Sequence, residues 1–358
     1  MPSQILHVLF GEDVIAAIYG SIHTHFGIVA EKALEKITGD YHASFMLGCQ
    51  GPDIFYHNQF TRPLSIEYGT LLHHRGYGIF TAELLKRSLP DPPPDEKDFN
   101  ALGAYSLGFM THALLDRYCH PYIVYKAGWT ADAGEGSTPL GKTAHAFFER
   151  ILDVLMFEYL RGKPVHIWKQ EALAAVCSAP PPGLKELLAK ALCAVYPERA
   201  GNDEKLLSRI ENAFIDCERV YRHTDPALTG IASVHGNDNS IDAPVLPYIF
   251  PQKFPLSVDY LNLAKKAYFD PAPGGKEDNR SFPELYSAAV SGAAAALGPD
   301  IKKYLETGIY PIREAAQSIG NSGLSIRGAD GRPCAPVRSV PLPLDSVLEQ
   351  QRRLRYGK

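Results

Sequence analysis

The sequence predicts a mostly α-helical fold: a multi-helix bundle with metal ligands from facing helices, followed by a less regular C-terminal extension. Apolar residues recur mostly at the spacing of a helix face rather than in alternation. Segments rich in proline, glycine or asparagine separate these stretches at 89–94, 179–183 and 235–242. Ten of the 13 histidines lie in the first 150 residues, where an even spread would place about five, and imidazole is the commonest metal ligand. A helical bundle presents such side chains to its interior from several helices.

The composition is that of a globular protein with a sizeable core. The chain has 358 residues, of which 45% are hydrophobic and 21% are charged. Its 36 basic and 40 acidic residues give a net charge of −4, so no basic field indicates a nucleic-acid partner. No run approaches the roughly 18 apolar residues of a membrane span, and the first residues lack the pattern of a signal peptide. We therefore expect a cytoplasmic protein whose six cysteines, which form no C-x-x-C pair, are free thiols.

The expected helices follow one another between the breaker segments, each with apolar residues three or four positions apart. In the first part of the chain they cover roughly 11–19, 25–38, 42–49, 66–88, 99–119, 142–160, 166–177, 183–195 and 203–221. Further helices are expected near 257–268, 283–297, 299–318 and 344–355. The tail is richer in proline and glycine and holds one histidine, His235. This shift predicts a helical metal-dependent domain over 1–225 and a helical or irregular extension over 226–358, either a lid-like unit or part of the same domain.

Three polar side chains share one face of the helix expected at 99–119. His112, Asp116 and His120 are four residues apart, so they spread over about 80° of the helix surface. They extend over about 12 Å of the axis, which is too far for one ion but suits adjacent ions with Asp116 between them. Pro121 disfavours helical geometry at the residue before it, so the helix is expected to end at His120. The alternative is a solvated polar face, or histidines that form hydrogen bonds within the core.

The next long helix repeats the four-residue spacing with His145 and Glu149. A single His-x-x-x-Glu pattern is common and is usually of no functional importance. Two helices with such patterns, close together in the sequence, favour a shared metal site over two unrelated polar faces.

Further candidate ligands lie upstream. Asp53 follows a Gly-Pro turn, where an Asx turn or a helix cap is the alternative interpretation. His73 and His74 begin an apolar-periodic stretch, and His7 lies in an apolar segment near the start of the chain. Adjacent helical residues point about 100° apart, so only one of His73 and His74 should be a ligand, and the apolar residues before them slightly favour His74. A ligand set of His, Asp and Glu without thiolate suits zinc, with iron or manganese as alternatives.

In this order along the chain, the candidate ligands resemble the zinc-dependent phospholipase C family, whose helical fold is shared with certain single-strand nucleases. The residues that carry the resemblance are His7, Asp53, His73, His74, His112, Asp116, His120, His145 and Glu149. It covers about residues 1–160, extends less well to 225, and leaves the tail unaccounted for. The resemblance implies a zinc-dependent phosphodiester hydrolase, a phospholipid or related phosphodiester as substrate, and transient contact with a membrane surface.

The resemblance also implies a distribution of the ligands between two zinc ions. The first zinc would be held by Asp53, His73 or His74, His112 and Asp116. The second would be held by His120, His145 and Glu149. Asp53 is in addition the implied general base. Two nearby arginines, Arg75 and Arg117, are candidates for steadying a phosphate.

A third zinc site of the family uses an early histidine, the bridging aspartate and an N-terminal tryptophan. His7 is the early histidine here, with His25 as a substitute. The tryptophans of this chain are Trp129 and Trp168, so the resemblance does not supply this ligand.

The sequence also contains a motif of a different functional class. Residues 136–143 match the P-loop pattern G-x-x-x-x-G-K-T, but the strand-like run at 122–125 stops too early to lead into a phosphate-binding turn. We expect this segment to be a surface loop before the helix of His145. The remaining alternatives are a non-catalytic binding or scaffold protein stabilised by metal, and a nuclease-like phosphodiesterase.

Overall fold

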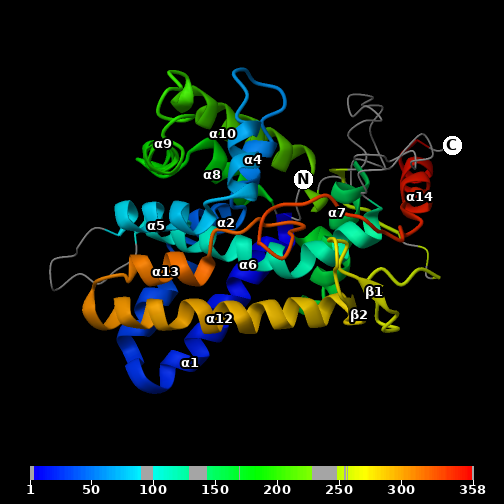
Figure 1. Cartoon of the computed structure of the whole chain (residues 1–358), viewed down its shortest axis with the longest axis horizontal. Coiled ribbons are helices and arrows are strands. Elements are labelled where there is room, and N and C mark those ends of the chain that lie inside the picture. Colours follow the sequence, from blue (N-terminus) through cyan, green and yellow to red (C-terminus); the bar gives the residue numbers. More distant parts are fainter. Residues whose placement is uncertain are drawn as a thin grey trace.

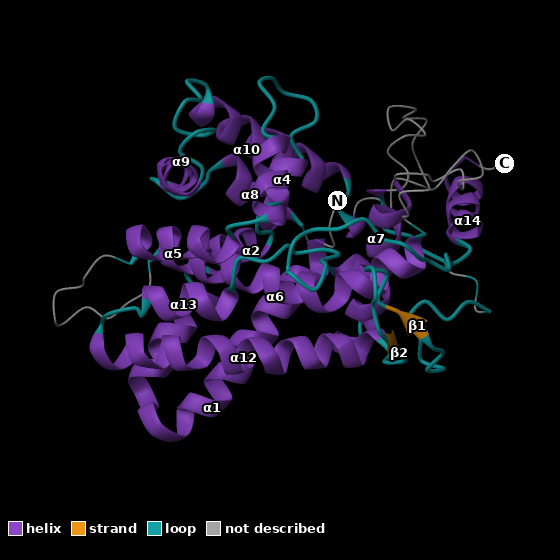
Figure 2. Ribbon diagram, in the orientation of Figure 1, coloured by secondary structure: helices purple, strands orange, loops and turns teal. Residues whose placement is uncertain are grey.

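Helices make up nearly all of the regular structure in the computed structural model of the chain, which confirms the predicted fold class (Figure 2). The structure describes residues 4–89, 100–128, 143–168, 170–227, 248–253, 255 and 257–356. The first helices are α1 (Gln4–Thr38), α2 (His42–Cys49), α3 (Asp53–Tyr56), α4 (Ile66–His74), α5 (Tyr77–Ser88), α6 (Ala101–Ala127) and α7 (Ala144–Arg161). They are followed by the 3₁₀ turn η2 (Val165–Ile167), α8 (Glu171–Ser178), α9 (Leu184–Val195), α10 (Leu206–His223), α12 (Phe282–Thr307), α13 (Ile312–Ile319) and α14 (Leu344–Tyr356). A two-stranded antiparallel hairpin, β1 (Tyr268–Phe269) with β2 (Glu277–Asp278), precedes α12.

Helix α6 runs through the middle of the molecule (Figure 1). It packs against α1, α2, α5, α7 and α12. In the view of Figure 1, α12 and the C-terminal end of α1 lie below it and the group α8–α10 lies above. Because α6 touches so many neighbours, its residues are almost all buried, and a polar side chain on it can meet side chains from several helices.

Helices α2 and α6 approach each other closely because glycines meet at their crossing. A Cβ added at Gly48 would lie 2.1 Å from the carbonyl oxygen of Tyr105, and one added at Gly108 would lie 2.3 Å from that of Phe45. Both distances are shorter than any tolerable contact, so only glycine fits at either position. This close contact determines how near the next turn of α6 lies to the turn between α2 and α3.

The C-terminal helices share the core of the N-terminal ones. Buried side chains of α12, among them Phe282 and Tyr286, belong to the same hydrophobic cluster as Phe10 of α1. The ring of Tyr286 lies edge-on to that of Phe10, and its hydroxyl donates a hydrogen bond to Asp13. Among the residues that the structure describes, no helix combines the length and hydrophobicity needed to cross a bilayer. All six cysteines are free, as expected.

The expected end of the central helix at His120 is wrong, because α6 continues through Pro121 to Ala127. Proline removes one backbone hydrogen bond of the helix and costs roughly 3 kcal/mol in an exposed setting. Here Tyr122, Val124 and the residues around them are buried, and their packing offsets that cost. The strand-like run at 122–125 is therefore helical.

Four other boundaries differ from expectation. The stretches 11–19 and 25–38 form one helix, α1, and the expected helix 66–88 is divided at Gly76, whose φ of 78° is left-handed. Helix α12 continues through Pro299, so that the expected break falls after Thr307 instead. No helix forms at 257–268, where the chain turns: Asn262 has a φ of 54°. The P-loop match lies outside the described residues except for Thr143, which precedes α7.

Candidate metal centre

Three groups of histidines and carboxylates converge where α1, α3, α4, α6 and α7 meet. Within each group the potential ligand atoms lie within 4.8 Å of one another. The groups are His7, His112 and Asp116; Asp53, His73 and His112; and His120, His145 and Glu149. The structure thus brings together eight of the sequence-predicted ligands.

The group of Asp53, His73 and His112 joins α3, α4 and α6. Its Oδ1 lies 3.1 Å from Nε2 of His73, and its Oδ2 lies 3.6 Å from Nε2 of His112. Asp53 begins α3 directly after the turn at Gly51 and Pro52, and its side chain is almost fully buried. A carboxylate therefore lies between imidazole nitrogens from two other helices.

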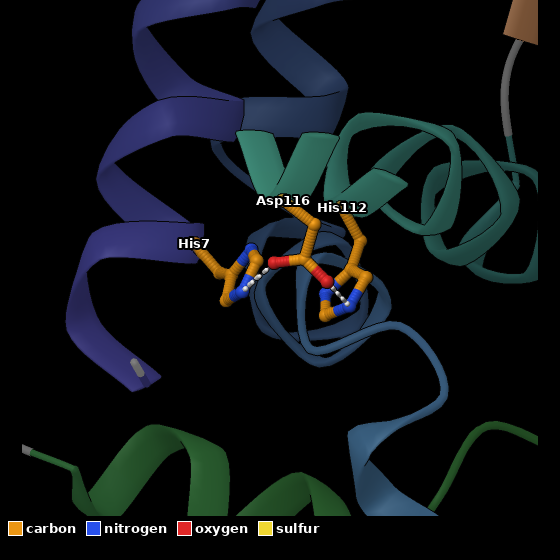
Figure 3. Close-up of side chains that lie close together, drawn as sticks. All are labelled: His7, His112 and Asp116. Carbon is orange, nitrogen blue, oxygen red and sulfur yellow. Dashed lines mark ion pairs between the residues drawn. The ribbon is translucent and has the colours of Figure 1, made fainter. Parts of the chain in front are cut away.

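Asp116 lies at the centre of the arrangement and joins it to α1 (Figure 3). Its Oδ1 is 3.3 Å from Nε2 of His7, and its Oδ2 is 3.1 Å from Nε2 of His112. The rings of His7 and His112 are stacked, with centroids 4.0 Å apart. On its other side Oδ2 lies 3.8 Å from Nδ1 of His120. Asp116 therefore contacts histidines that belong to different groups.

The remaining group joins α6 to α7. Oε1 of Glu149 lies 3.0 Å from Nε2 of His145 and 3.3 Å from Nε2 of His120. His145 and Glu149 are one helical turn apart in α7, as their spacing predicts. This group lies one turn further along α6 than Asp116, which agrees with the axial spread expected from the sequence.

The donor set fits a divalent cation. Asp53, Asp116 and Glu149 are all buried, and within the described part of the chain none of them forms an ion pair with lysine or arginine. Both oxygens of Asp53, Oδ2 of Asp116, Oε2 of Glu149 and Nε2 of His112 are buried without a hydrogen bond of acceptable geometry. Buried carboxylates without a permanently charged partner are costly, and a bound cation removes that cost.

The distances also suit zinc. With metal–ligand bonds of about 2.0–2.1 Å in a tetrahedral site, neighbouring ligand atoms are about 3.3 Å apart. The nitrogen–oxygen distances within the groups, from 3.0 to 3.6 Å, lie around that value. No thiol belongs to any of the three groups, which favours zinc in a site of nitrogen and oxygen ligands, or manganese or iron.

Backbone carbonyls fix the orientation of three of the histidines. Nδ1 of His73 lies 2.8 Å from the carbonyl oxygen of Gly69, and Nδ1 of His112 lies 3.2 Å from that of Cys49. Nδ1 of His120 lies 3.3 Å from the carbonyl oxygen of Leu324. A carbonyl only accepts hydrogen bonds, so each Nδ1 carries a proton and each Nε2 faces the neighbouring carboxylate, where either a second proton or a metal ion can lie between the two atoms. A metal ion that binds here takes the place of the Nε2 proton and leaves the Nδ1 hydrogen bonds intact.

The electrostatics of the metal-free centre keep the carboxylates ionised. Burial alone would raise the pKa of Asp116, but the charges of His120 and His112 and a hydrogen bond from His7 hold it well below its usual range. Burial likewise opposes ionisation of Glu149, yet His145 and His120 lower its pKa. Burial would also lower the pKa of His120, but Asp116 and Glu149 raise it to about 9. Anionic carboxylates are the form that a metal requires.

The turn before α3 positions both Asp53 and His112. Gly51 has a left-handed φ of 56°, and a Cβ added there would lie 2.4 Å from Cγ of the His112 ring. Only glycine meets both demands, since other residues rarely adopt this conformation and any Cβ would displace the imidazole. The Gly-Pro-Asp sequence thus has a structural reason beyond an ordinary turn or cap.

The structure places His73 against the centre and not His74, which the sequence slightly favoured. His74 is exposed, whereas Nε2 of His73 faces Asp53. The apolar residues before this pair did not indicate the face correctly, because Leu72 is buried but Leu71 only partly so. His25 lies within α1, but its side chain is outside the described residues. Arg117 does not face the centre's carboxylates, since its guanidinium donates to backbone carbonyls of residues 319–323.

Sequence reasoning missed the backbone groups that orient the histidines. The carbonyl of Gly69 could have been found, because it lies one helical turn before His73. The carbonyls of Cys49 and Leu324 come from other segments, and no pattern in the sequence indicates them.

A helical bundle whose interior gathers histidines and carboxylates in this way has the side chains that could hold metal ions. The family described as zinc dependent phospholipase C matches residues 16–200, just over half of the 358 residues. The chain therefore belongs to the zinc-dependent phospholipase C family, which confirms the resemblance and supports an enzyme of this general kind. The match includes every ligand candidate except His7, and nothing after residue 200. No curated protein and no solved structure matches the chain significantly.

Proposed function

We propose that the chain is a zinc-dependent phosphodiester hydrolase that cleaves a phospholipid, or a related phosphodiester, to an alcohol and a phosphomonoester. The observation that carries the proposal is the set of three buried carboxylates, each facing histidine Nε2 atoms and none paired with a lysine or arginine among the described residues, in a member of this family. Such a centre has the charge and the donor atoms that metal-assisted hydrolysis requires.

In this proposal Asp53, His73, His112 and Asp116 hold one zinc ion. His120, His145 and Glu149 hold a second, and His7 with Asp116 forms part of a third site. Zinc in these sites would neutralise phosphoryl oxygens and lower the pKa of water towards about 7.

The side chains have distinct tasks in the hydrolysis. Asp53 acts as general base: one of its oxygens takes a proton from the attacking water, and the other would bind the zinc ion. Asp116 keeps the ring of His7 and that of His112 at a fixed distance from each other. Among the eight side chains of the three groups, His73 and His145 are the most exposed, with 12% and 14% of their side chains accessible, so substrate reaches the centre from their side.

The test is metal analysis of the purified protein together with assays on phosphatidylcholine vesicles, a soluble chromogenic phosphodiester and single-stranded DNA. We expect at least two zinc ions per chain, hydrolysis of the lipid or the soluble diester, loss of turnover on chelation and recovery with zinc. Asp53→Asn should abolish turnover while zinc remains at the His145 group; the exposed Asp330→Asn serves as the control.

The alternatives give different results in the same assays. Full zinc occupancy without turnover of any diester would refute the proposal. It would indicate that the zinc has a structural role in a non-catalytic scaffold protein. Cleavage restricted to DNA would favour the nuclease-like activity instead. A general base is distinguished from a mere ligand if Asp53→Asn keeps its zinc.

We also propose that residues 226–358 belong to the same domain as residues 1–225. In support, Phe282 and Tyr286 of α12 are buried in the cluster that contains Phe10 of α1. A separate lid would have a core of its own and only a small, polar contact with the rest.

A further inference from the structure

A short C-terminal segment, here called the strap (residues 319–327), lies against the candidate metal centre. It begins at the end of α13 and lies outside the region that matches the family. Leu324, which is fully buried, lies at its middle. The strap is therefore a feature of this chain that the family match does not account for.

Leu324 connects two candidate ligands from different groups. Its backbone N–H donates a hydrogen bond of 2.9 Å to the carbonyl oxygen of His73. Its own carbonyl oxygen lies 3.3 Å from Nδ1 of His120, to which it is the acceptor. One peptide segment thus holds the end of α4 that carries His73 and also sets the ring orientation of His120 in α6.

Arg117 anchors the strap to α6. The guanidinium donates to four strap carbonyls, those of Ile319, Gly320, Ser322 and Gly323. Arg117 is the neighbour of Asp116, so the anchor begins beside the carboxylate at the centre of the arrangement. A planar guanidinium with several fixed donors suits this task better than any other side chain.

The strap is also tied to the start of α5. The N–H of Gly78 donates 2.9 Å to the carbonyl oxygen of Gly320, and the N–H of Ile79 donates 3.0 Å to Oδ1 of Asn321. These contacts leave the strap little freedom to move away from the centre. Its position is therefore set by α5 and α6 before any metal binds.

We propose that the strap is a positioning element of the metal centre and that Arg117 is its positioning residue, an inference that rests on the proposed zinc sites. The carbonyl of Leu324 keeps the proton on Nδ1 of His120 and its Nε2 towards Glu149, the orientation in which the imidazole can bind metal. His73 and His112 take the same support from helices α4 and α2, whereas His120 takes it from the strap. Loss of Arg117 removes the four hydrogen bonds that tie the strap to α6, and so weakens the support of His120 and His73 without removing a ligand.

The test compares Arg117→Met with Arg209→Met in metal binding. Arg209 is likewise part-buried and donates to a backbone carbonyl, that of Leu64, and to Asp203, but it contacts none of the ligand candidates. Zinc affinity is measured by competition with a chelator. The visible spectrum of the cobalt-substituted protein reports the geometry of the site, and thermal melting of the metal-free protein reports the stability of the fold.

For Arg117→Met we expect zinc affinity to fall about 10- to 100-fold, the usual effect of removing a group that orients a ligand, with an altered cobalt spectrum. Arg209→Met should keep both the affinity and the spectrum of the wild type. Arg117→Lys, which retains the charge and one set of donors, should lie between the wild type and Arg117→Met. It also replaces Arg117→Met in the comparison if that variant does not fold.

The inference is overturned if the Arg117 variants bind zinc within about twofold of the wild type and keep its cobalt spectrum, or if they lose no more affinity than Arg209→Met. A wild type that binds neither metal would overturn the metal centre and this inference together. A wild type that binds zinc but hydrolyses no phosphodiester would contradict the proposed function alone, because the comparison of the arginine variants does not depend on turnover.

Discussion

At the scale of single residues, the centre depends on which ring nitrogen of each histidine faces inward. His73, His112 and His120 each give Nδ1–H to a backbone carbonyl, so each Nε2 is free to bind a metal. A neighbouring histidine without such a carbonyl and without a facing carboxylate has no comparable role. His73 and His74 are adjacent, and only His73 has both contacts, so replacing each in turn measures how much these contacts matter for metal binding.

We predict that His73→Ala loses zinc and that His74→Ala does not. Nε2 of His73 lies 3.1 Å from Asp53, while His74 is exposed. His73→Ala should lower zinc affinity by more than the roughly 10–100-fold that follows loss of an orienting partner. His74→Ala should change stability by no more than about 0.5 kcal/mol. Metal analysis after dialysis against a weak chelator provides the comparison, and equal zinc losses in the two variants would contradict it.

Asp116→Ala should damage the centre more than the loss of any one histidine. Its two oxygens face His7 and His112, and the ring of His120 lies beyond, so the change affects more than one group. His145→Ala should empty one site, because its contact in the centre is to Glu149. Zinc per chain, measured by mass spectrometry, should therefore be lower in Asp116→Ala than in His145→Ala. Normal zinc in Asp116→Ala would show that this carboxylate does not join the groups.

Within one helix, the relative positions of the candidate ligands could be predicted from the sequence. The period of an α-helix places His112, Asp116 and His120 on one face whatever else the chain does. The contact of Asp116 with His7, more than 100 positions earlier, and the choice of His73 over His74 depend on how the helices pack. Spacing along the chain carries no information about that packing.

At the scale of elements, the turn between α2 and α3 does the most to shape the centre. Gly51 combines a left-handed φ with close contact to the ring of His112. Gly162, which ends α7, has a similar φ of 62°, but a Cβ there would meet nothing within 4 Å. The two glycines therefore separate the cost of the backbone conformation from the cost of the contact.

Gly162→Ala should cost about 1–2 kcal/mol, the strain of a left-handed residue with a Cβ. Gly51→Ala should cost about 1–3 kcal/mol more, because the methyl group overpacks against the imidazole. It should also reduce zinc affinity, since His112 contributes to two of the groups. Urea denaturation and zinc titration of both variants give these values. An equal loss of stability and unchanged zinc binding would mean that the ring of His112 moves aside at no cost.

The loop between α3 and α4 is held by the carboxylate of Asp216 in α10. Its oxygens accept hydrogen bonds from the backbone N–H groups of Phe60 and Thr61, the hydroxyl of Thr61 and the amide of Asn58. Burial opposes the charge of Asp216, but these hydrogen bonds outweigh it and lower its pKa. The ionised carboxylate therefore stabilises the loop that joins the helices of Asp53 and His73.

Asp216→Asn should cost about 1–3 kcal/mol at pH 7, because an amide group turns its donors towards other donors. The stabilisation from a carboxyl group with a lowered pKa is complete above its unfolded value of about 3.9 and is lost as the pH falls through the folded value. The difference between the wild type and the variant should therefore shrink below about pH 4. Denaturation at pH 7 and pH 3 tests this, with the exposed Glu211→Gln in the same helix as the control. A difference that is independent of pH would contradict the role of the charge.

The ends of a helix could be predicted where local sequence preferences determine them. This holds for α2, whose bounds match the expectation. They could not be predicted where burial overrides a local preference. Pro121 and Pro299 lie inside helices because the residues beyond them pack into the core, and Pro121 alone suggested that α6 should end at His120. Helix α6 is longer than expected for this reason.

At the scale of the whole molecule, the centre joins helices that lie far apart in the sequence. Its ligand candidates come from α1, α3, α4, α6 and α7, and the strap adds the C-terminal part. Three buried carboxylates bring negative charge into one place, which opposes folding when no cation is bound. Zinc should therefore contribute to the stability of the entire fold rather than to one local site.

We predict that chelation lowers the melting temperature of the whole protein. At zinc concentrations a thousandfold above the dissociation constant, binding stabilises the folded state by about 4 kcal/mol per site. With an unfolding entropy of about 2 cal/mol/K per residue, each occupied site should raise the melting temperature of a chain of 358 residues by about 5 °C. Scanning calorimetry with and without chelator should show one transition that shifts as a unit, because the ligands are spread over the shared core.

The zinc-dependent shift should also become smaller as the pH falls. Zinc must displace the proton of His120, whose pKa is raised to about 9 in the metal-free centre by Asp116 and Glu149 against the effect of burial. More protons compete for the imidazoles at pH 5 than at pH 8, so the shift between metal-free and zinc-loaded protein should be larger at pH 8. Magnesium, which prefers oxygen ligands, should produce a much smaller shift at the same concentration. A melting temperature that is the same with zinc and with chelator at pH 8 would show that the buried carboxylates are compensated without a metal.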